Sequence, residues 1–511
     1  MSSKQRLILL IIVVLAFILR AYSLTDVPSG LNQDEAVSGY DAYSISTNLH
    51  DHKGNFMPIA FESFGDYTSP ILTYLLVPFV KVMGLNMLSI RLPVALLGTL
   101  SVLLIFRISL KIIDNINVAL VGALLLCLMP WSISLSRWSI PPNIVVFFLL
   151  LSILWLFEAV NDQRKYKYIL FGITFGLLTY TYPTLKLFVP LMAVSIIYIL
   201  LRNKVQKKYI LISFATTILI ALPILIMTIL NGSKYNSRFN EISILSLNMP
   251  VIEFIKRYIE YFTPNFLFGF GDSNIMQHIP RFGLIYGIFG FLFYPGVMLI
   301  IYKLYQGTVL KEKMCLQILL SWLVIFPIPA SLTRDYDQTL RVVHGLPLII
   351  IIICYFFNFV LNNVGFKRLW LNIFVIFIFF NSILFINFYF NTYPNLSRVG
   401  FQYGTKQIYE YLLAHESEFD GVNVDQMYNN SYIYYLFYSK YNPNHLDYQA
   451  INAITGDKDY WDGVHVLGKY KFKYITDDLS SYKNIFEIKD GKKVFARIYA
   501  KDRNFIVKRI L

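Results

Sequence analysis

Residues Leu7–Leu24 read LILLIIVVLAFILRAYSL, a run close to the ~20 apolar residues that a helix needs to cross a bilayer. Similar runs recur as far as Asn391. The run follows Lys4 and Arg6, so a signal peptide is the alternative. It is long for the apolar core of a signal peptide, however, and no small-residue cleavage site follows it. The pattern therefore predicts a retained membrane helix and a polytopic membrane protein.

The composition excludes several classes of protein. Of the 511 residues 56% are hydrophobic and 17% aromatic, and the net charge is +14. The Lys and Arg residues are dispersed among short loops, which is typical of cytoplasmic loops facing anionic lipid and not of a nucleic-acid partner. Cys127, Cys315 and Cys354 lie in or beside apolar runs without metal-type spacing. A disulfide framework is not expected.

Hydropathy predicts an all-α polytopic domain, residues 1–392, and a less hydrophobic tail, residues 393–511. Eleven spans are expected, at about 7–24, 88–110, 116–133, 143–160, 169–183, 185–201, 209–230, 283–302, 314–331, 343–361 and 369–390. With the N-terminus in the cytoplasm, every basic cluster between spans falls on the cytoplasmic side. Ser69–Gly84 is apolar but short and contains Pro70 and Pro78, so we predict an interfacial or re-entrant helix there.

The tail is predicted to be a small extracytoplasmic α/β domain. Thr405–Glu416 has the pattern of a helix and Gly421–Met427 that of a strand. Ile485–Ala500 has the pattern of a hairpin that turns at Asp490-Gly491.

The loop after the first apolar run holds the candidate catalytic acids. Asp34 is our candidate general base, because a partly desolvated carboxylate at the lipid–water boundary can take a proton from an acceptor hydroxyl or amine. Glu35 could orient a partner. The alternative is that one acid of the pair only caps a helix over Ala36–Asn48. Asp66 lies between Gly65 and Pro70 and could be a turn residue or a second acid for acceptor binding or proton relay.

Arginines in the predicted external loops are candidate phosphate ligands, because a guanidinium can hold a phosphate bidentately. The candidates for donor-phosphate binding are Arg137, Arg341, Arg334 and His344. The alternative is that Arg side chains at span ends reach up to lipid headgroups. We favour function for Arg137 and Arg341, and the headgroup alternative for Arg334 and for Arg91. The cluster of His50, Asp51 and His52 matches no defined metal site, so we predict no cofactor, and a divalent metal is the less favoured alternative.

Several motifs occur in an order that resembles a known family. The Asp34-Glu35 pair is followed along the chain by Phe64-Gly-Asp-Tyr-Thr-Ser-Pro70, Arg91-Leu-Pro-Val-Ala-Leu-Leu-Gly98, Leu135-Ser-Arg-Trp138 and Thr179-Tyr-Thr-Tyr-Pro183. The order resembles the GT-C superfamily of integral-membrane glycosyltransferases, in the bacterial branch related to protein O-mannosyltransferases and the lipid A aminoarabinose transferase. The resemblance covers about residues 5–395.

The resemblance implies a polyprenyl-phosphate sugar as donor and transfer, usually with inversion, on the extracytoplasmic face. Asp34 would take the place of the family's catalytic acid, with Glu35 as its motif partner. Relatives often carry an acid where Ile140-Pro-Pro-Asn143 stands here, a departure that raises Asp66 as the second carboxylate. The acceptor stays open between protein, lipid and envelope glycan. The rival hypothesis is a transporter or lipid flippase, which predicts ionisable residues within the spans, and these are almost free of acids.

Overall fold

The computed structural model describes residues 1–230, 232, 237–269, 271–425, 431–452, 466–473, 475, 478–490 and 493–510. The chain forms two compact units, each built from segments that are distant in sequence. The helical unit comprises Met1–Tyr22 and Val94–Tyr393, and the mixed unit comprises Ser23–Pro93 and Pro394–Leu511. The expected division of the chain into domains at residues 392 and 393 stays a prediction.

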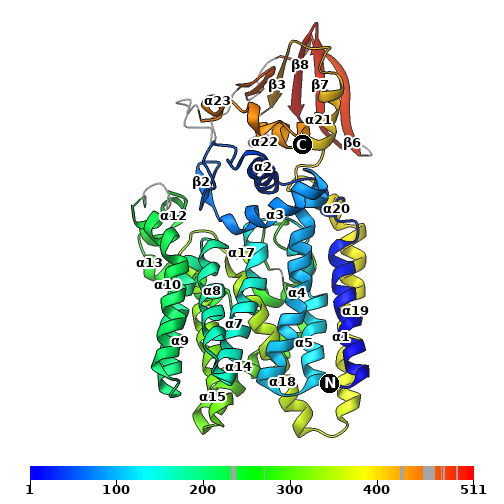
Figure 1. Ribbon diagram of the computed structural model, residues 1–511. Helices are drawn as coiled ribbons and strands as arrows, with labels where there is room; N and C mark the ends of the chain where they lie inside the picture. The colour runs from blue at the N-terminus through cyan, green and yellow to red at the C-terminus, as the bar shows by residue number, and fades with distance from the viewer. Residues whose placement is uncertain are drawn as a thin grey trace. The chain divides into compact units, whose positions relative to one another are not determined.

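The helical unit is a bundle of long apolar helices with short helices in its connections (Figure 1). Its helices are α1 (Ser3–Ala21), α4 (Met87–Ile113, whose first turns belong to the mixed unit), α5 (Ile116–Leu128), α6 (Pro130–Leu135), α7 (Val145–Asp162), α8 (Lys165–Leu177), α9 (Leu185–Arg202), α10 (Lys207–Leu230), α12 (Ser237–Ile242), α13 (Pro250–Glu260), α14 (Gly290–Gln306), α15 (Leu310–Ile325), α16 (Ile328–Ser331), α17 (Thr339–Val342), α18 (Leu346–Asn363) and α19 (Lys367–Asn391).

Within the described residues, 8 helical segments are long and apolar enough to cross a membrane. They match eight of the expected spans and make the chain a multi-pass membrane protein. The other three expected spans are also helical, but they differ in detail. Helix α1 carries Lys4, Arg6 and Arg20, while α5 and α8 have only 13 residues each.

Helix α5 is shorter than the expected span because the chain breaks at Pro130. Proline has no N–H to donate to the Leu126 carbonyl, so the helix cannot continue. The Arg20 guanidinium takes up the carbonyls left at this end, donating to those of Leu126 and Cys127 at 3.1 and 3.3 Å. It also donates to the Ser132 hydroxyl at 2.7 Å. The buried Arg20 therefore caps α5 from the neighbouring helix α1.

The helices of the bundle differ in how much of their apolar surface is buried. In the segment Thr339–Asn363, which contains α17 and α18, 83% of the most apolar 18-residue stretch is buried. In α19 only 17% of the corresponding stretch is buried. Helix α18 thus forms the core of the bundle, packed on α5 and α14, while α19 leaves most of its apolar surface for lipid. Helices α8 and α10 cross closely because a Cβ at Gly172 would lie 2.4 Å from the Ser213 carbonyl oxygen.

The mixed unit joins the helices and the hairpin of the first loop to the sheet and helices of the tail. Its elements are α2 (Gln33–Asn48), β1 (Phe61–Ser63), β2 (Asp66–Thr68), α3 (Pro70–Met83), α20 (Tyr393–Ser397, which begins in the helical unit), α21 (Thr405–Ala414), β3 (Gly421–Asp425), α22 (Ser431–Ser439), α23 (Tyr448–Asn452), β4 (Val466–Leu467), β5 (Tyr470–Lys473), β6 (Lys483–Asp490), β7 (Lys493–Lys501) and β8 (Asn504–Arg509). The 14-residue α3 is too short to span a bilayer, as expected for Ser69–Gly84.

The sheet of the tail has the order β4-β5-β3-β8-β7-β6. Strand β3 runs parallel to β5 and β8, and the remaining pairs are antiparallel, so the tail is α/β as expected. The expected helix at 405–416 and the paired strands at 485–500 are confirmed. Residues 426–427 of the expected strand and Gly491 of the expected turn lie outside the described residues.

Side chains and backbone tie the first loop to the tail within the mixed unit. The Tyr40 hydroxyl donates to the Tyr441 carbonyl at 2.9 Å, and the Asn452 amide donates to the Lys53 carbonyl at 2.9 Å. Gly30 has a φ of +108°, and a Cβ there would lie 2.1 Å from the Phe401 carbonyl oxygen, so only glycine fits. The loop that holds Asp34 is therefore supported by residues some 400 positions later in the chain.

Candidate active site

Asp34 stands in the first turn of helix α2, which a reciprocal cap begins. The Asn32 side chain accepts from the Asp34 N–H at 2.9 Å, and the Glu35 carboxylate accepts from the Asn32 N–H at 3.2 Å. The helix expected over Ala36–Asn48 thus starts three residues earlier. The alternative that one acid of the pair caps the helix applies to Glu35, whereas the Asp34 side chain takes no part in the cap.

Glu35 is held by Arg91, and both side chains are completely buried. Arg91 Nε and Nη2 each donate to a carboxylate oxygen of Glu35 at 2.8 Å. The guanidinium also donates to the carbonyls of Leu24, Pro28 and Gly30 at 3.0, 3.1 and 2.6 Å. The expectation that Arg91 reaches up to headgroups is wrong, because it organises the loop that enters α2.

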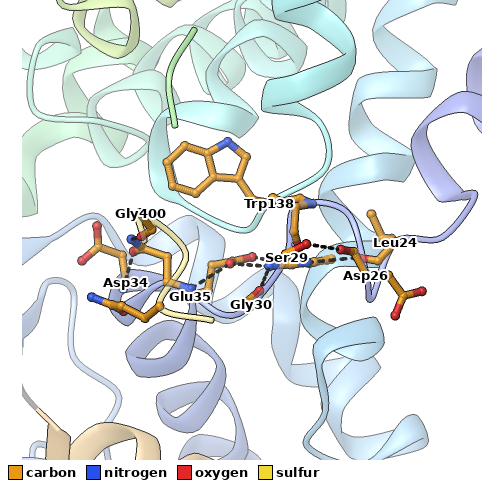
Figure 2. A network of polar contacts seen from close by, with 12 residues as sticks. Leu24, Asp26, Ser29, Gly30, Asp34, Glu35, Trp138 and Gly400 are labelled. Atoms are coloured by element: carbon orange, nitrogen blue, oxygen red, sulfur yellow. Dashed lines mark hydrogen bonds and ion pairs between the residues drawn. The ribbon is translucent and has the colours of Figure 1, made fainter. Parts of the chain in front are cut away.

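The Asp34 carboxylate points away from this network (Figure 2). Its side chain is half-buried, and within the described part of the chain no group donates a hydrogen bond to it. Burial, followed by the charges of Glu35 and Asp66, raises the pKa of Asp34 to about 6. A carboxylate with a pKa near neutrality and with free lone pairs can act as a general base.

Asp66 belongs to a tight hairpin beside this acid. Strands β1 and β2 pair with Ser63 opposite Asp66, and the two residues between them, Phe64 and Gly65, both have positive φ. That turn matches the right-handed twist of a hairpin. One Asp66 oxygen accepts from the Tyr67 N–H at 2.7 Å. The expected turn is confirmed, and its charge lies close enough to Asp34 to raise the pKa of that carboxyl.

Arg137, a predicted phosphate ligand, is buried in the helical unit. Its two terminal nitrogens each donate at 2.7 Å, to the carbonyls of Leu19 and Tyr22 at the end of α1. The guanidinium lies 4.9 Å from the centre of the Phe390 ring. These contacts give Arg137 a role in capping α1, and its role toward a phosphate stays a prediction.

Arg334 and Arg341 lie in one loop of the helical unit. Arg341 donates to the Thr333 hydroxyl and forms an ion pair of 2.6 Å with the half-exposed Asp335. Arg334 donates to the Ser243 carbonyl at 3.0 Å. Arg257, which no sequence pattern singled out, holds the same loop by donating to the Thr333 and Arg334 carbonyls, each at 2.9 Å.

His344 lies inside the helical bundle. Its Nε2 is 3.0 Å from the Phe326 carbonyl oxygen, and its ring centre is 4.5 Å from that of Phe188. The Nδ1 atom is buried and has no partner in the described chain. Its place as a phosphate ligand stays a prediction. The structure therefore brings Asp34, Glu35 and Asp66 together in the mixed unit, and the four candidate phosphate ligands belong to the helical unit.

His52 pairs with Asp41 and makes no metal cluster. His52 Nδ1 lies 2.7 Å from an Asp41 carboxylate oxygen, which also accepts from the His52 N–H at 2.8 Å. Burial opposes the charged form, but the Asp41 charge and hydrogen bond outweigh it and hold the pKa of His52 above its usual value. Among the described residues no group of three His, Cys, Asp or Glu side chains could hold a metal ion.

This pair yields a pH-dependent stability prediction. Because the pKa of His52 is raised on folding, the pair stabilises below about pH 6.5 and loses that contribution as the pH rises through the folded pKa. Besides Asp41, the groups facing His52 are Asp51, Lys53 and the Tyr432 hydroxyl. We expect Asp41→Asn to lower the melting temperature more at pH 6 than at pH 9. Asp420→Asn, in an exposed pair with Arg503, should show no such difference.

A family model described as dolichyl-phosphate-mannose-protein mannosyltransferase matches residues 67–227. The fold is similar to that of ArnT from Cupriavidus metallidurans bound to undecaprenyl phosphate, with a TM-score of 0.51, 12% identity, and coverage of 85% of this chain and 84% of that one. At this identity the likeness shows that the chain shares the fold of that membrane protein.

A second solved structure has a similar fold. The archaeal oligosaccharyltransferase AglB from Archaeoglobus fulgidus, in complex with an inhibitory peptide and a dolichol-phosphate, has a TM-score of 0.52 and 13% identity. The match covers 85% of this chain and 64% of AglB, so this chain spans less than two thirds of that protein. At these identities the likeness establishes the fold. No curated protein matches by sequence.

Proposed function

We propose that this membrane protein is a GT-C-type glycosyltransferase, which transfers a sugar from a polyprenyl-phosphate-linked donor to an acceptor on the extracytoplasmic face of the membrane. The observation that carries the proposal is Asp34, a half-buried carboxylate with a pKa raised to about 6 and no hydrogen-bond donor among the described residues. The donor class is supported by the two structures of the same fold that hold dolichol-phosphate and undecaprenyl phosphate.

The chemistry is a single displacement at the anomeric carbon. An acceptor hydroxyl or amine attacks that carbon as the bond to the phosphate oxygen breaks, and polyprenyl phosphate leaves with the electron pair. Asp34 takes the acceptor's proton. Attack opposite the leaving group inverts the anomeric configuration. Asp66, the second acid beside Asp34, is assigned to the acceptor, and Glu35 to holding the helix that presents Asp34.

The leaving phosphate needs cationic stabilisation, and Arg341 is the first candidate. Its ion-pair partner Asp335 is half exposed, so a lipid phosphate can replace that carboxylate at small cost. Arg334 and His344 are secondary candidates. Arg137 comes last, because exchanging its two helix carbonyls for phosphate would uncap α1.

A transporter or flippase is less well supported. That class predicts unpaired or water-exposed charges along the spans. Arg20, a buried cation of α1, is instead engaged by backbone carbonyls and serine hydroxyls.

The donor class can be tested on the lipid that copurifies with the protein. We expect mass spectrometry of the purified protein in mild detergent to detect a polyprenyl phosphate or its glycosylated form. Enrichment of ordinary phospholipid alone, in the presence of added polyprenyl phosphate, would contradict the proposal. The proposed orientation, with the N-terminus cytoplasmic and the tail outside, would fail if Lys204–Lys208 were labelled from outside the cell.

The pKa of Asp34 sets the pH dependence of transfer. Only the carboxylate form accepts a proton, so the rate at saturating donor should rise as the pH passes about 6 and level off above pH 7. Initial rates of polyprenyl-phosphate release between pH 5 and 8 measure this rise in rate. A rate that is independent of pH over that interval would argue against Asp34 as the base.

A further inference from the structure

Arg257 of α13 is a buried cation that joins its helix to the loop 332–338, which leads into α17. Its Nη1 atom forms an ion pair of 2.6 Å with Glu253, one turn earlier in α13. Its Nε and Nη2 atoms donate to the carbonyls of Thr333 and Arg334, each at 2.9 Å. All three nitrogens of the guanidinium are therefore engaged by protein oxygens, two of which belong to the loop.

Tyr336 of the same loop adds two further contacts to α13. The Arg257 guanidinium lies 3.9 Å from the centre of the Tyr336 ring, and the Tyr336 hydroxyl donates to the Glu253 carboxylate at 2.8 Å. A planar guanidinium can stack on a ring and bond two carbonyls at the same time, which a lysine ammonium cannot do. The contact therefore depends on the geometry of the side chain as well as on its charge.

Helix α13 turns its charged side toward this loop. Ile252, Ile255 and Ile259 are about half exposed, whereas Arg257 is buried. A surface helix usually buries its apolar side. Burying a cation is unfavourable unless it is paired and hydrogen-bonded, and the loop supplies two of the hydrogen bonds that Arg257 needs. The helix is thus held to the loop by polar contacts.

Thr333 connects Arg257 to Arg341, the first candidate ligand for the donor phosphate. Its carbonyl accepts from Arg257, and its hydroxyl accepts from Arg341 Nη1. The same hydroxyl donates to the Ala330 carbonyl at 2.7 Å, which fixes its direction. On the other side, the Thr333 backbone forms an antiparallel bridge with Ser243. A shift of Thr333 would therefore move the group that orients the Arg341 guanidinium.

We propose that Arg257 is a positioning residue of the donor-phosphate site, which holds Thr333 in the place from which it orients Arg341 toward the lipid phosphate. The inference rests on the proposed function, in which that phosphate replaces the carboxylate of Asp335 on Arg341 Nη2. Arg341 keeps its Nη1 atom on Thr333 during this exchange. Arg257 acts through Arg341 and makes no contact with the donor.

A double-mutant cycle tests whether Arg257 acts through Arg341. The probe is undecaprenyl phosphate, and its dissociation constant is measured with the purified full-length protein in mild detergent. We expect Arg341→Met to weaken binding roughly tenfold to a hundredfold, as for the loss of a hydrogen bond to a charged group. Arg257→Met should weaken it roughly fivefold to twentyfold in the wild type, but by less than about twofold in the Arg341→Met background.

Arg257→Lys separates position from charge and remains informative if Arg257→Met does not fold. The ammonium can keep the pair with Glu253 but cannot donate to both loop carbonyls while it stacks on Tyr336. We expect this variant to lose affinity by a similar factor to Arg257→Met, and again only in the presence of Arg341. Wild-type affinity in Arg257→Lys would show that charge alone is needed and would overturn the proposal.

Lys256→Met is the matched control. Lys256 is the exposed neighbour of Arg257 in α13 and pairs with the same carboxylate of Glu253 at 3.1 Å. Its substitution removes a cation from this carboxylate and leaves the loop contacts in place. Affinity for undecaprenyl phosphate should stay within about twofold of wild type, as for most surface changes away from a site.

Failure of this inference can be distinguished from failure of the proposed function. If Arg341→Met bound undecaprenyl phosphate as tightly as wild type, the role of Arg341 in the proposed function would be wrong, and the inference with it. If Arg341→Met weakened binding, but Arg257→Met and Arg257→Lys caused the same loss in both backgrounds, Arg257 would have a general structural role or its own phosphate contact. That result would overturn the inference and leave the proposed function standing.

Discussion

Asp34→Asn is expected to lower the rate of sugar transfer by about 10²–10⁴-fold, the range that a positioned general base supplies. The amide keeps the shape of the side chain but cannot take the acceptor's proton. Because burial and two neighbouring acids disfavour the charged form of Asp34, the variant should be at least as stable as wild type at pH 7. Polyprenyl-phosphate release tests the expected loss of transfer, and the melting temperature, measured in parallel, tests the expected stability.

Asp26→Asn is the control for this variant. Asp26 lies in the same loop but is exposed, and its carboxylate accepts from the hydroxyls of Ser23, at 2.9 Å, and Thr25, at 3.3 Å. Its substitution should leave transfer within about twofold of wild type, as for most surface changes away from a site. Full transfer by a folded Asp34→Asn would remove Asp34 from the mechanism.

Arg91→Met is expected to be the most destabilising single change in the mixed unit. It leaves the Glu35 carboxylate buried without its cation and releases three loop carbonyls, a loss of about 3–5 kcal/mol. Because the loop positions Asp34, transfer should fall as well. Thermal unfolding of the purified protein measures the loss of stability.

A double variant separates the ion pair from the loop contacts. Arg91→Met with Glu35→Gln removes the unpaired charge, so it should recover part of the stability that Arg91→Met loses. Lys406→Met, which breaks an exposed pair with Glu410 at 3.7 Å, should change stability by less than about 0.5 kcal/mol. Equal losses in the Arg91 and Lys406 variants would show that burial of the Glu35–Arg91 pair has no energetic weight.

Local patterns predicted much of the fold, because apolar run length and strand alternation are properties of neighbouring residues. The long helices, the short α3, and the helix and hairpin of the tail follow from such patterns. The early end of α5 shows the limit. The apolar run continues past Leu128, and only the missing N–H of Pro130 and the distant cation Arg20 decide where the helix stops.

The candidate site was predictable only in part, for a similar reason. Residue type and the resemblance pointed to Asp34, and the hairpin turn at Gly65 placed Asp66 in a tight turn. Partners distant in sequence were not predictable. Arg91 was expected at the headgroups, yet it pairs with Glu35 across 56 positions. The packing of α22 against α2 joins residues about 400 positions apart, and no local pattern encodes it.

In the proposed reaction a lipid-phosphate sugar is the donor and Asp34 is the general base. The most direct measurement reconstitutes the purified protein in liposomes with extracted polyprenyl-phosphate sugars and a membrane extract as acceptor, and quantifies free polyprenyl phosphate by mass spectrometry. We predict release that requires both protein and acceptor, occurs in wild type and Asp26→Asn, and is nearly absent in Asp34→Asn. Release at equal rates in wild type and a folded Asp34→Asn, or transfer from a nucleotide sugar with no lipid donor present, would contradict this reaction.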